Sequence, residues 1–212
     1  MTAFLGLCLG WAYPAHAATV DLANLLENSG FEDDLKHSDW MASRANPNFT
    51  LDAPKVNPVI VPKDESTRLA APAGNNFIGI LNPNDLNRSG KLVHSVVEGS
   101  FPAGTVFQVT VWANRGRLAK ATSALFTSSP SEVLVQLNGW QAGHLPVLNP
   151  KTDNWSRSPN VKVVQVFTDW AENGEWASQT FEFVTTKDLQ YVSLAITGVN
   201  HKNASYVAFD VE

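Results

Sequence analysis

The sequence predicts an all-β domain in which two antiparallel sheets pack face to face as a sandwich. Short segments of alternating apolar and polar residues recur along the chain, and Gly, Pro and Asn separate them. No apolar pattern with a period of 3.6 residues persists for the length of a domain helix. Period-two segments at near-regular spacing, with turn residues between them, are typical of sandwiches and jelly rolls. We therefore expect fewer than about one residue in ten to be helical.

The clearest predicted strand covers residues 105–113, TVFQVTVWA. Because successive side chains of a strand point to opposite faces, this segment has one apolar and one polar face. The apolar face is predicted to enter the core and consists of Phe107, Val109, Val111 and Ala113. The opposite face carries one tryptophan among polar groups and consists of Gln108, Thr110, Trp112 and Asn114.

Seven further segments have the composition of strands. In chain order they are NFIGIL (76–81), KLVHSVV (91–97), SEVLVQL (131–137), VKVVQVF (161–167), WASQTFEFV (176–184), YVSLAI (191–196) and SYVAFDV (205–211). One long stretch between predicted strands, residues 138–160, is rich in Asn and Pro and is expected to be an irregular loop. Loops of this length are often functional.

The first 17 residues differ from the rest of the chain. They contain no charged side chain and pass from an apolar run to a small-residue ending, Ala-His-Ala. This pattern predicts a signal peptide over residues 1–17, cleavage after Ala17, and a secreted or cell-surface protein. A buried helix is the alternative, which Pro14 disfavours. The domain then spans residues 18–212 and has no disulfide, because the one cysteine, Cys8, lies in the leader.

The charge pattern argues against nucleic acid as a partner. The formal net charge is −5, and Lys and Arg do not form clusters. Affinity for nucleic acid depends mainly on basic side chains that neutralise phosphates. Outside the leader, no apolar stretch of the sequence is long enough to span a bilayer. The sequence also lacks a P-loop, a dinucleotide-binding fingerprint and a Gly-x-Ser-x-Gly nucleophile elbow.

Residues 25–34, LLENSGFEDD, place three carboxylates in a row directly after turn residues. Like charges this close together repel one another. A folded chain therefore needs a cation or hydrogen-bond donors beside them.

Five motifs follow one another through the sequence after the leader. They are LLENSGFEDDL (25–35) with Trp40 after it, APAGNNFIGIL (71–81), KLVHSVVEGSFPAGTVFQVTVWANR (91–115), ENGEWASQTFEFVTT (172–186) and SYVAFDVE (205–212). In this order they resemble the carbohydrate-binding modules of the galactose-binding-domain-like superfamily, which are jelly-roll β-sandwiches. The resemblance implies an exported, non-catalytic module that binds a polysaccharide or oligosaccharide.

The resemblance also implies a structural calcium ion. In that family calcium commonly joins the N-terminal turn to an acidic residue in the last strand, and these positions are Glu32 and Asp210 here. Calcium prefers carboxylate and carbonyl oxygens and would stabilise a domain that has no disulfide. The chain departs from the family's usual ending, because Val211 stands where a second acidic or amide residue is common. The alternative is a solvated turn, with Asp210 accepting backbone hydrogen bonds; Asp33 and Asp34 are expected to be solvated.

We predict a ligand face around Trp112, because aromatic rings stack on sugars while amide and hydroxyl groups orient them. The candidate residues are Gln108, Trp112, Asn114 and Arg115, with Trp140 and Trp155 from the long loop. Gln136 and Asn138 join this face if their strand lies next to that of Trp112. Alternatively, Trp112 packs beneath the loop and the loop tryptophans pin it to the sandwich. Trp40 and Trp176 match family positions that pack beneath the sheets and are predicted to be structural.

Two other functions stay open. Jelly rolls of this kind also occur as alkaloid cyclases, in which an aspartic acid in an aromatic pocket protonates the substrate. Such chemistry needs a carboxyl group whose pKa is raised by burial, and Asp169 beside Trp170 is the nearest counterpart here. The other possibility is a surface or matrix domain that mediates protein contacts, because a fold alone does not decide function.

Overall fold

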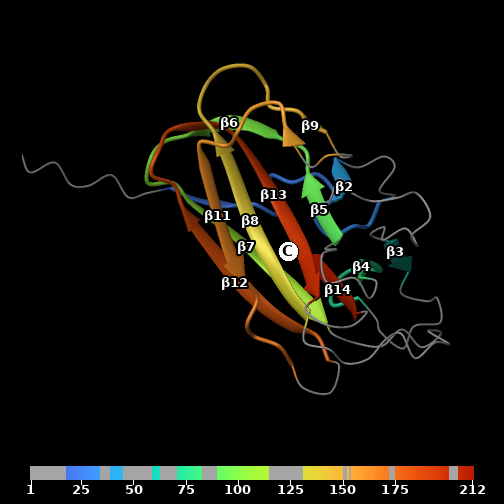
Figure 1. Ribbon diagram of the computed structural model, residues 1–212. Coiled ribbons are helices and arrows are strands. Elements are labelled where there is room, and N and C mark those ends of the chain that lie inside the picture. Colours follow the sequence, from blue (N-terminus) through green and yellow to red (C-terminus); the bar gives the residue numbers. More distant parts are fainter. Residues whose placement is uncertain are drawn as a thin grey trace, which may run out of the picture.

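The structure is a computed structural model in which strands are the regular elements. It describes residues 18–33, 39–44, 59–62, 71–82, 90–114, 131–149, 152, 154–171, 175–200 and 205–212. None of these residues lies in a helix, so the described part of the chain offers no helix that could cross a membrane. The strands form two layers (Figure 1), which confirms the predicted all-β sandwich. The predicted leader, residues 1–17, lies outside the described residues.

Sheet A is built around the most clearly predicted strand. In spatial order it contains β12 (Ala177–Val184), β7 (Val106–Asn114), β1 (Thr19–Asp21) together with β14 (Ser205–Val211), then β4 (Asn76–Asn82) and β3 (Val59–Pro62). β12 pairs with residues 106–113 of β7, so β1 and β14 share the opposite edge of that strand. The pairing of β1 with β7 is parallel, and the other pairings of this sheet are antiparallel.

Sheet B is antiparallel and is built around β8 and β13. In spatial order it contains β11 (Val161–Val166), β8 (Ser131–Trp140), β13 (Leu189–Asn200), β5 (Gly90–His94) together with β6 (Val97–Phe101), and β2 (Trp40–Arg44). The prediction of one strand over residues 91–97 is wrong, because β5 and β6 are separate strands that both pair with β13. At the interruption the Ser193 hydroxyl donates a hydrogen bond to the His94 carbonyl, at 2.7 Å.

The stretch 138–160 is more regular than the sequence predicts. β8 continues to Trp140, and a two-stranded antiparallel ribbon follows, formed by β9 (Leu148–Asn149) and β10 (Asn154–Trp155). Leu148 and Trp155 are opposite each other in this ribbon, and both pack against sheet B. The expectation of an irregular loop is wrong because these apolar side chains bury themselves on the sheet.

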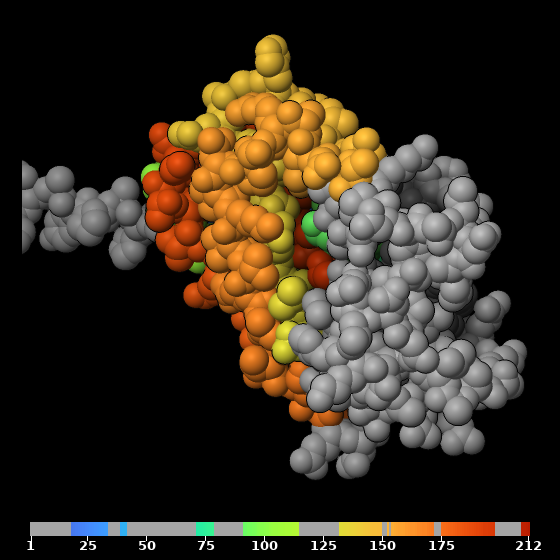
Figure 2. Space-filling view, in the orientation of Figure 1, coloured from blue at the N-terminus to red at the C-terminus, as the bar shows by residue number. Residues whose placement is uncertain are grey.

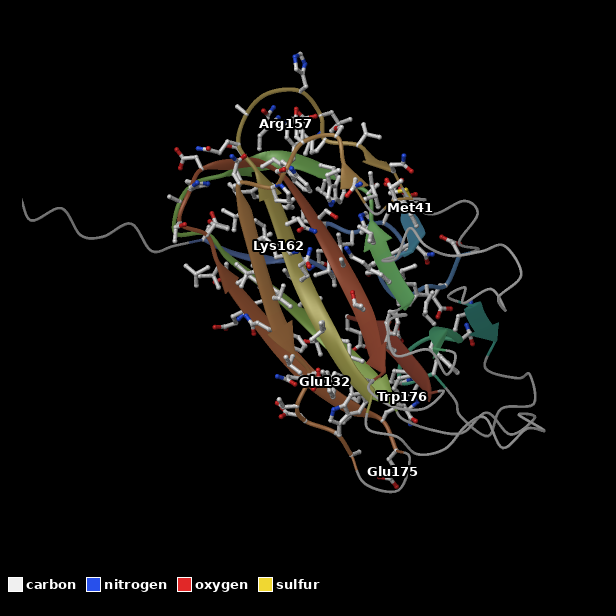
Figure 3. The ribbon with its side chains drawn as sticks, viewed as in Figure 1. Met41, Glu132, Arg157, Lys162, Glu175 and Trp176 are labelled. Carbon is white, nitrogen blue, oxygen red and sulfur yellow. The ribbon has the colours of Figure 1, made fainter. Side chains whose placement is uncertain are left out.

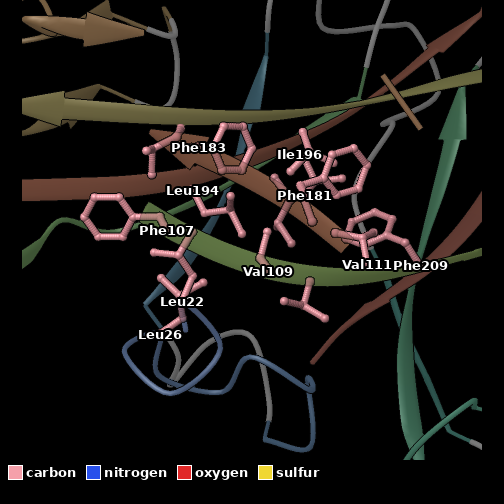
Figure 4. Packing of buried hydrophobic residues seen from close by; sticks show 14 of the residues in the cluster. Leu22, Leu26, Phe107, Val109, Val111, Phe181, Phe183, Leu194, Ile196 and Phe209 are labelled. Atoms are coloured by element: carbon pink, nitrogen blue, oxygen red, sulfur yellow. The ribbon is translucent and has the colours of Figure 1, made fainter. Parts of the chain in front are cut away.

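The core lies between the sheets (Figure 4), and the predicted inward face of β7 is confirmed. All four apolar side chains of that face are at most 1% exposed. The neighbouring strands supply further side chains that are no more exposed, among them Phe181, Phe183, Leu194, Ile196 and Phe209. Alternation of buried and half-buried residues along β7 shows that its other face points away from the core.

The N-terminal segment closes one end of the core. The Phe31 ring lies 5.2 Å from the Trp40 ring, measured between centroids. Trp40 is 3% exposed, and its indole N–H donates to the Asn28 carbonyl at 3.1 Å. These contacts confirm the structural role predicted for Trp40. Trp176 is half-buried and rests edge-on against the buried Phe77 ring, with the centroids 5.3 Å apart.

Candidate functional site

The structure divides the predicted ligand residues between two opposite surfaces. Gln108, Trp112 and Asn114 belong to β7 in sheet A, whereas Gln136 and Asn138 belong to β8 in sheet B. Each strand turns its apolar residues toward the shared core, so the two polar faces point away from each other. β7 and β8 are not neighbours, so the condition for Gln136 and Asn138 to join the face of Trp112 is not met.

The outer face of sheet A satisfies its own polar groups. Across β7 and β12 the Gln108 amide donates to the Glu182 carboxylate, and the Thr110 and Thr180 hydroxyls lie 3.0 Å apart. The Trp112 indole N–H donates to Glu212 Oε2 at 2.8 Å. These groups are paired within the protein.

The structure does not add Asn114 or Arg115, the other two candidates near β7, to the outer face of sheet A. Asn114 continues the strand but is completely buried, although alternation places it on the polar side. Arg115 lies outside the described residues. Of the candidates predicted on this strand, Gln108 and Trp112 are therefore the ones that the structure places at the surface.

The outer face of sheet B is organised in rows across the strands. One row joins Lys162 of β11, Asn138 of β8 and Ser193 of β13. The next joins Val164, Gln136 and Ala195 in the same way. Side chains opposite each other in antiparallel strands lie about 5 Å apart and can act together. Lys162 and Glu132 are labelled on this face in Figure 3, toward opposite ends of the sheet.

Asn138 is the polar residue of this face that the protein leaves incompletely bonded. Its Oδ1 accepts a hydrogen bond from Gln136 Nε2 at 2.6 Å. Its Nδ2 is buried and has no hydrogen-bond partner among the described residues. The neighbouring Ser193 hydroxyl uses its proton on the His94 carbonyl. Asn138 is 1% exposed. An unsatisfied buried donor costs about 1–3 kcal/mol, so an acceptor that enters the face and reaches this amide would be bound favourably.

The β9–β10 ribbon brings an aromatic ring to the same face. Trp155 is half-buried and packs with Val93, Leu148 and Ala195 on the outer side of sheet B. Ala195 is also the register partner of Gln136, so the ring and the amide pair occupy adjoining parts of one surface. In Figure 2, atoms of β8 (yellow), β13 (red) and β5 (green) lie deeper than the orange atoms on one side of them.

Trp140 holds this ribbon down and is itself inaccessible. It is fully buried, and its ring meets that of Trp155 at 4.6 Å between centroids. Its indole N–H donates to the Arg157 carbonyl at 3.0 Å. The Arg157 guanidinium in turn donates to the carbonyls of His144 and Gln141, at 2.7 and 3.4 Å. Trp140 was predicted either to line a ligand pocket or to hold this stretch on the sandwich, and its buried ring is placed for the second role.

The predicted metal ligands lie around the turn at 71–75. Glu32 Oε1 accepts the backbone N–H groups of Asn75 and Asn76 at 2.8 and 2.9 Å. Gly74 has φ +58°, and a Cβ at this position would overlap Glu32 Oε1. The turn is therefore shaped around the Glu32 carboxylate, which is exposed but not merely solvated.

Asp210 is a buried carboxyl group with one oxygen that no well-formed hydrogen bond reaches among the described residues. Its Oδ1 accepts the Val211 N–H at 2.9 Å, whereas its Oδ2 is buried and has no hydrogen-bond partner among the described residues. Burial, together with the negative charges of Glu212 and Glu32, raises the pKa of Asp210 to about 7, and backbone hydrogen bonds from Val211 and Ala73 oppose this rise. Nearby carboxylates and an unused oxygen are what a bound cation would relieve.

A cation at this position could not be held by a ready-made cluster of side chains. Among the described residues, no group of three or more His, Cys, Asp or Glu side chains is arranged to hold a metal ion. Calcium would need backbone carbonyl, amide or water oxygens to complete its shell. The least-bonded carboxylate oxygens here are Asp210 Oδ2, which no well-formed hydrogen bond reaches among the described residues, and Glu32 Oε2, which has one contact at 3.4 Å from Asn75 Nδ2.

Asp169 does not have the surroundings that acid catalysis would require. Its side chain is exposed, and its Oδ1 accepts the Thr168 hydroxyl at 3.0 Å. Trp170 points to the core instead, where its ring meets Phe167 at 4.8 Å between centroids. The aspartate and the tryptophan therefore do not form one pocket.

Comparisons with known proteins find similarity among solved structures. No family model matches the chain. No curated protein matches it. The tailspike protein 4 enzymatically active domain of bacteriophage CBA120 is 9% identical with a TM-score of 0.47, and the match covers 88% of this chain but 20% of that one.

Two carbohydrate-binding modules match over nearly their whole length. TmCBM61 in complex with β-1,4-galactotriose is 14% identical with a TM-score of 0.46. The match covers 89% of this chain and 97% of that one. The family 11 module from Clostridium thermocellum, in complex with a β-1,3-1,4-mixed-linked tetrasaccharide, is 11% identical with a TM-score of 0.46, and 87% of this chain covers 91% of that one. These modules are β-sandwiches, as this chain is, and the similarity is confined to the arrangement of the strands.

Proposed function

We propose that this chain is a non-catalytic carbohydrate-binding module whose ligand lies on the outer face of sheet B. The observation that carries the proposal is the buried, unpartnered Nδ2 of Asn138 beside Gln136. A sugar hydroxyl accepts one hydrogen bond and donates another, so it can satisfy an amide pair of this kind. The proposal therefore moves the ligand face from Trp112 to β8.

Apolar groups next to the amides suit the carbon-bound faces of sugar rings. Trp155 is half-buried beside them, and Val164, opposite Gln136 on β11, is 44% exposed. Aromatic and aliphatic surface supplies contact area while amides fix orientation. With the predicted leader, we place such binding outside the cell or at its surface.

The test is binding to a panel of soluble polysaccharides by affinity electrophoresis, followed by titration calorimetry with the best ligand. Asn138→Ala and Gln136→Ala should each weaken binding about tenfold or more, the loss expected for a buried hydrogen bond. Thr110→Ala on the outer face of sheet A is the matched control and should bind as the parent protein does. Equal losses in all three variants, or none in the β8 pair, would reject the proposed face.

We further propose that Asp210 and Glu32 contribute oxygens to a structural Ca²⁺. The support is the free, buried Oδ2 of Asp210 and the carboxylates around it. A bound cation would supply the positive charge that these carboxylates lack and would tie the turn at 71–75 to the last strand. Because such a site exists only in the folded chain, binding would stabilise that state.

Melting with millimolar Ca²⁺ and with a chelator tests this site. Ca²⁺ should raise the melting temperature of the parent protein, and Asp210→Asn should abolish the difference. Asp169→Asn, which changes an exposed carboxylate elsewhere, should keep the full response to Ca²⁺. If the parent protein melts at the same temperature in both conditions, the carboxyl cluster holds no structural Ca²⁺.

A further inference from the structure

Charge is distributed unevenly along the proposed ligand face. Lys162 on β11 is exposed and stands directly opposite Asn138. Within the described part of the chain, its side chain takes part in no hydrogen bond or ion pair. Glu132 lies six residues from Asn138 along β8, a separation of about 20 Å at the rise of a strand. Among the residues that the structure describes, Lys162 at the Asn138 end of the face therefore has no ion-pair partner.

The two unpaired groups at this end are both hydrogen-bond donors. An ammonium group has three N–H donors and no acceptor, and Asn138 Nδ2 likewise can only donate. Lys162 and Asn138 are cross-strand partners, so the exposed ammonium group and the buried amide donor belong to neighbouring side chains of one face. A carboxylate accepts through two oxygens and makes charge-assisted hydrogen bonds that are stronger than those of a neutral hydroxyl.

We infer that the ligand of this face is an acidic polysaccharide, one whose uronate carboxylate is bound by Lys162 together with Asn138. This inference rests on the proposed function and narrows its ligand class. The net charge of −5 means that the protein as a whole repels a polyanion. Recognition would consequently depend on the local lysine rather than on long-range attraction, and it should weaken as added salt screens that contact.

The experiment compares acidic and neutral polysaccharides on the full domain. The acidic set is polygalacturonate, alginate and glucuronoxylan, and the neutral set is galactan, mixed-linkage β-glucan and fully methyl-esterified pectin. Methyl-esterified pectin keeps the polygalacturonate backbone but removes its charge, so this pair isolates the carboxylate. The variants are Lys162→Gln, which keeps chain length without charge, and Lys187→Gln, an exposed lysine on the turn after β12. Affinity is measured by titration calorimetry at low and physiological salt.

The parent protein should bind a member of the acidic set and should lose at least about tenfold in affinity when the carboxylates are esterified or when Lys162→Gln removes the charge. Lys187→Gln should bind as the parent does. Binding confined to neutral polymers, or an acidic ligand that Lys162→Gln binds equally well, would overturn this inference while the carbohydrate-binding function stands. Binding to none of the polymers would overturn both.

Discussion

The outer faces of the two sheets both carry polar side chains, but these side chains differ in whether they hydrogen-bond to each other. On sheet A, threonine faces threonine and glutamine faces glutamate, and these pairs form hydrogen bonds with each other. On sheet B, Asn138 faces a lysine and Gln136 faces a valine. Neither of those partners on β11 offers an acceptor, and Asn138 Nδ2 has no hydrogen-bond partner among the described residues. The comparison shows that the cross-strand partner, rather than the polarity of a strand, decides whether a face is available to a ligand.

The two faces also use tryptophan differently. Trp112 on sheet A donates to Glu212 at the surface, whereas Trp140 on sheet B is buried beneath the ribbon and meets Trp155. Trp112 therefore lies on a face whose polar groups are already hydrogen-bonded. Trp140 instead holds the β9–β10 ribbon against sheet B.

Trp140→Ala should have the largest effect, because it removes the ring that holds the β9–β10 ribbon against sheet B. Removing a fully buried aromatic ring should lower the free energy of unfolding by about 3–5 kcal/mol. Because Trp140 supports Trp155, ligand binding should fall as well. Urea denaturation followed by fluorescence and calorimetric titration measure the two effects. A Trp140→Ala protein of parental stability would show that the ribbon is not anchored by this ring.

Trp112→Ala should have an intermediate effect on stability and none on binding. The half-buried ring and its hydrogen bond to Glu212 should contribute about 1–2 kcal/mol to the free energy of unfolding. The same denaturation and binding measurements apply. A Trp112→Ala protein that is stable but no longer binds polysaccharide would move the ligand face back to sheet A.

Asn138→Ala should separate function from stability. The change removes an unsatisfied buried donor but also takes away the acceptor of Gln136. Because these effects oppose each other, the free energy of unfolding should change by less than about 1 kcal/mol. Binding should nevertheless weaken about tenfold. A loss of several kcal/mol in the denaturation curve would mean that Asn138 is a structural residue of sheet B.

The smallest expected effect is on the pH dependence of stability and concerns His94. Unlike the Asn138 amide nitrogen, both ring nitrogens of His94 face carbonyl oxygens. Nδ1 lies 2.8 Å from the Ser95 carbonyl and Nε2 lies 3.2 Å from the Glu27 carbonyl. Burial nevertheless lowers the pKa of His94 below its usual 6.5, against the opposing influence of these carbonyls and of the Asp39 and Glu27 charges. The unfolded chain therefore takes up this proton at a higher pH than the folded protein does.

The stability that a neutral His94 contributes should be fully present above pH 6.5 and should be lost as the pH falls below that value. Asp210 titrates in the opposite sense, since its raised pKa favours the folded state at low pH. Comparing the parent protein with His94→Gln at each pH removes the Asp210 contribution. The difference in melting temperature between the two should shrink or reverse on acidification. A difference that is constant from pH 8 to 5 would contradict the lowered pKa.

Local pattern in the sequence was enough to predict the sandwich and the direction of its clearest strand. Period-two alternation identified the buried face of β7, and the same alternation placed Gln136 and Asn138 away from the core. Trp155 was also among the candidate ligand residues, but as an aromatic residue of a stretch expected to be an irregular loop. The resemblance to known modules implied a role for Asp210, whose Oδ2 has no hydrogen-bond partner among the described residues.

Which strands become neighbours was decided by the tertiary structure. Alternation along a strand has a period of two residues and says nothing about the partner across the sheet, which loop closure and packing of the whole chain determine. For that reason the sequence grouped Gln136 and Asn138 with Trp112, and it did not indicate Lys162 or Val164. The pairing of β8 with β11 put a lysine opposite an asparagine, and the folding of the ribbon brought Trp155 beside them. The sequence by itself determined the faces; the tertiary structure decided which of them has hydrogen-bonding groups left over, because satisfaction of a polar group depends on contacts between residues far apart in the chain.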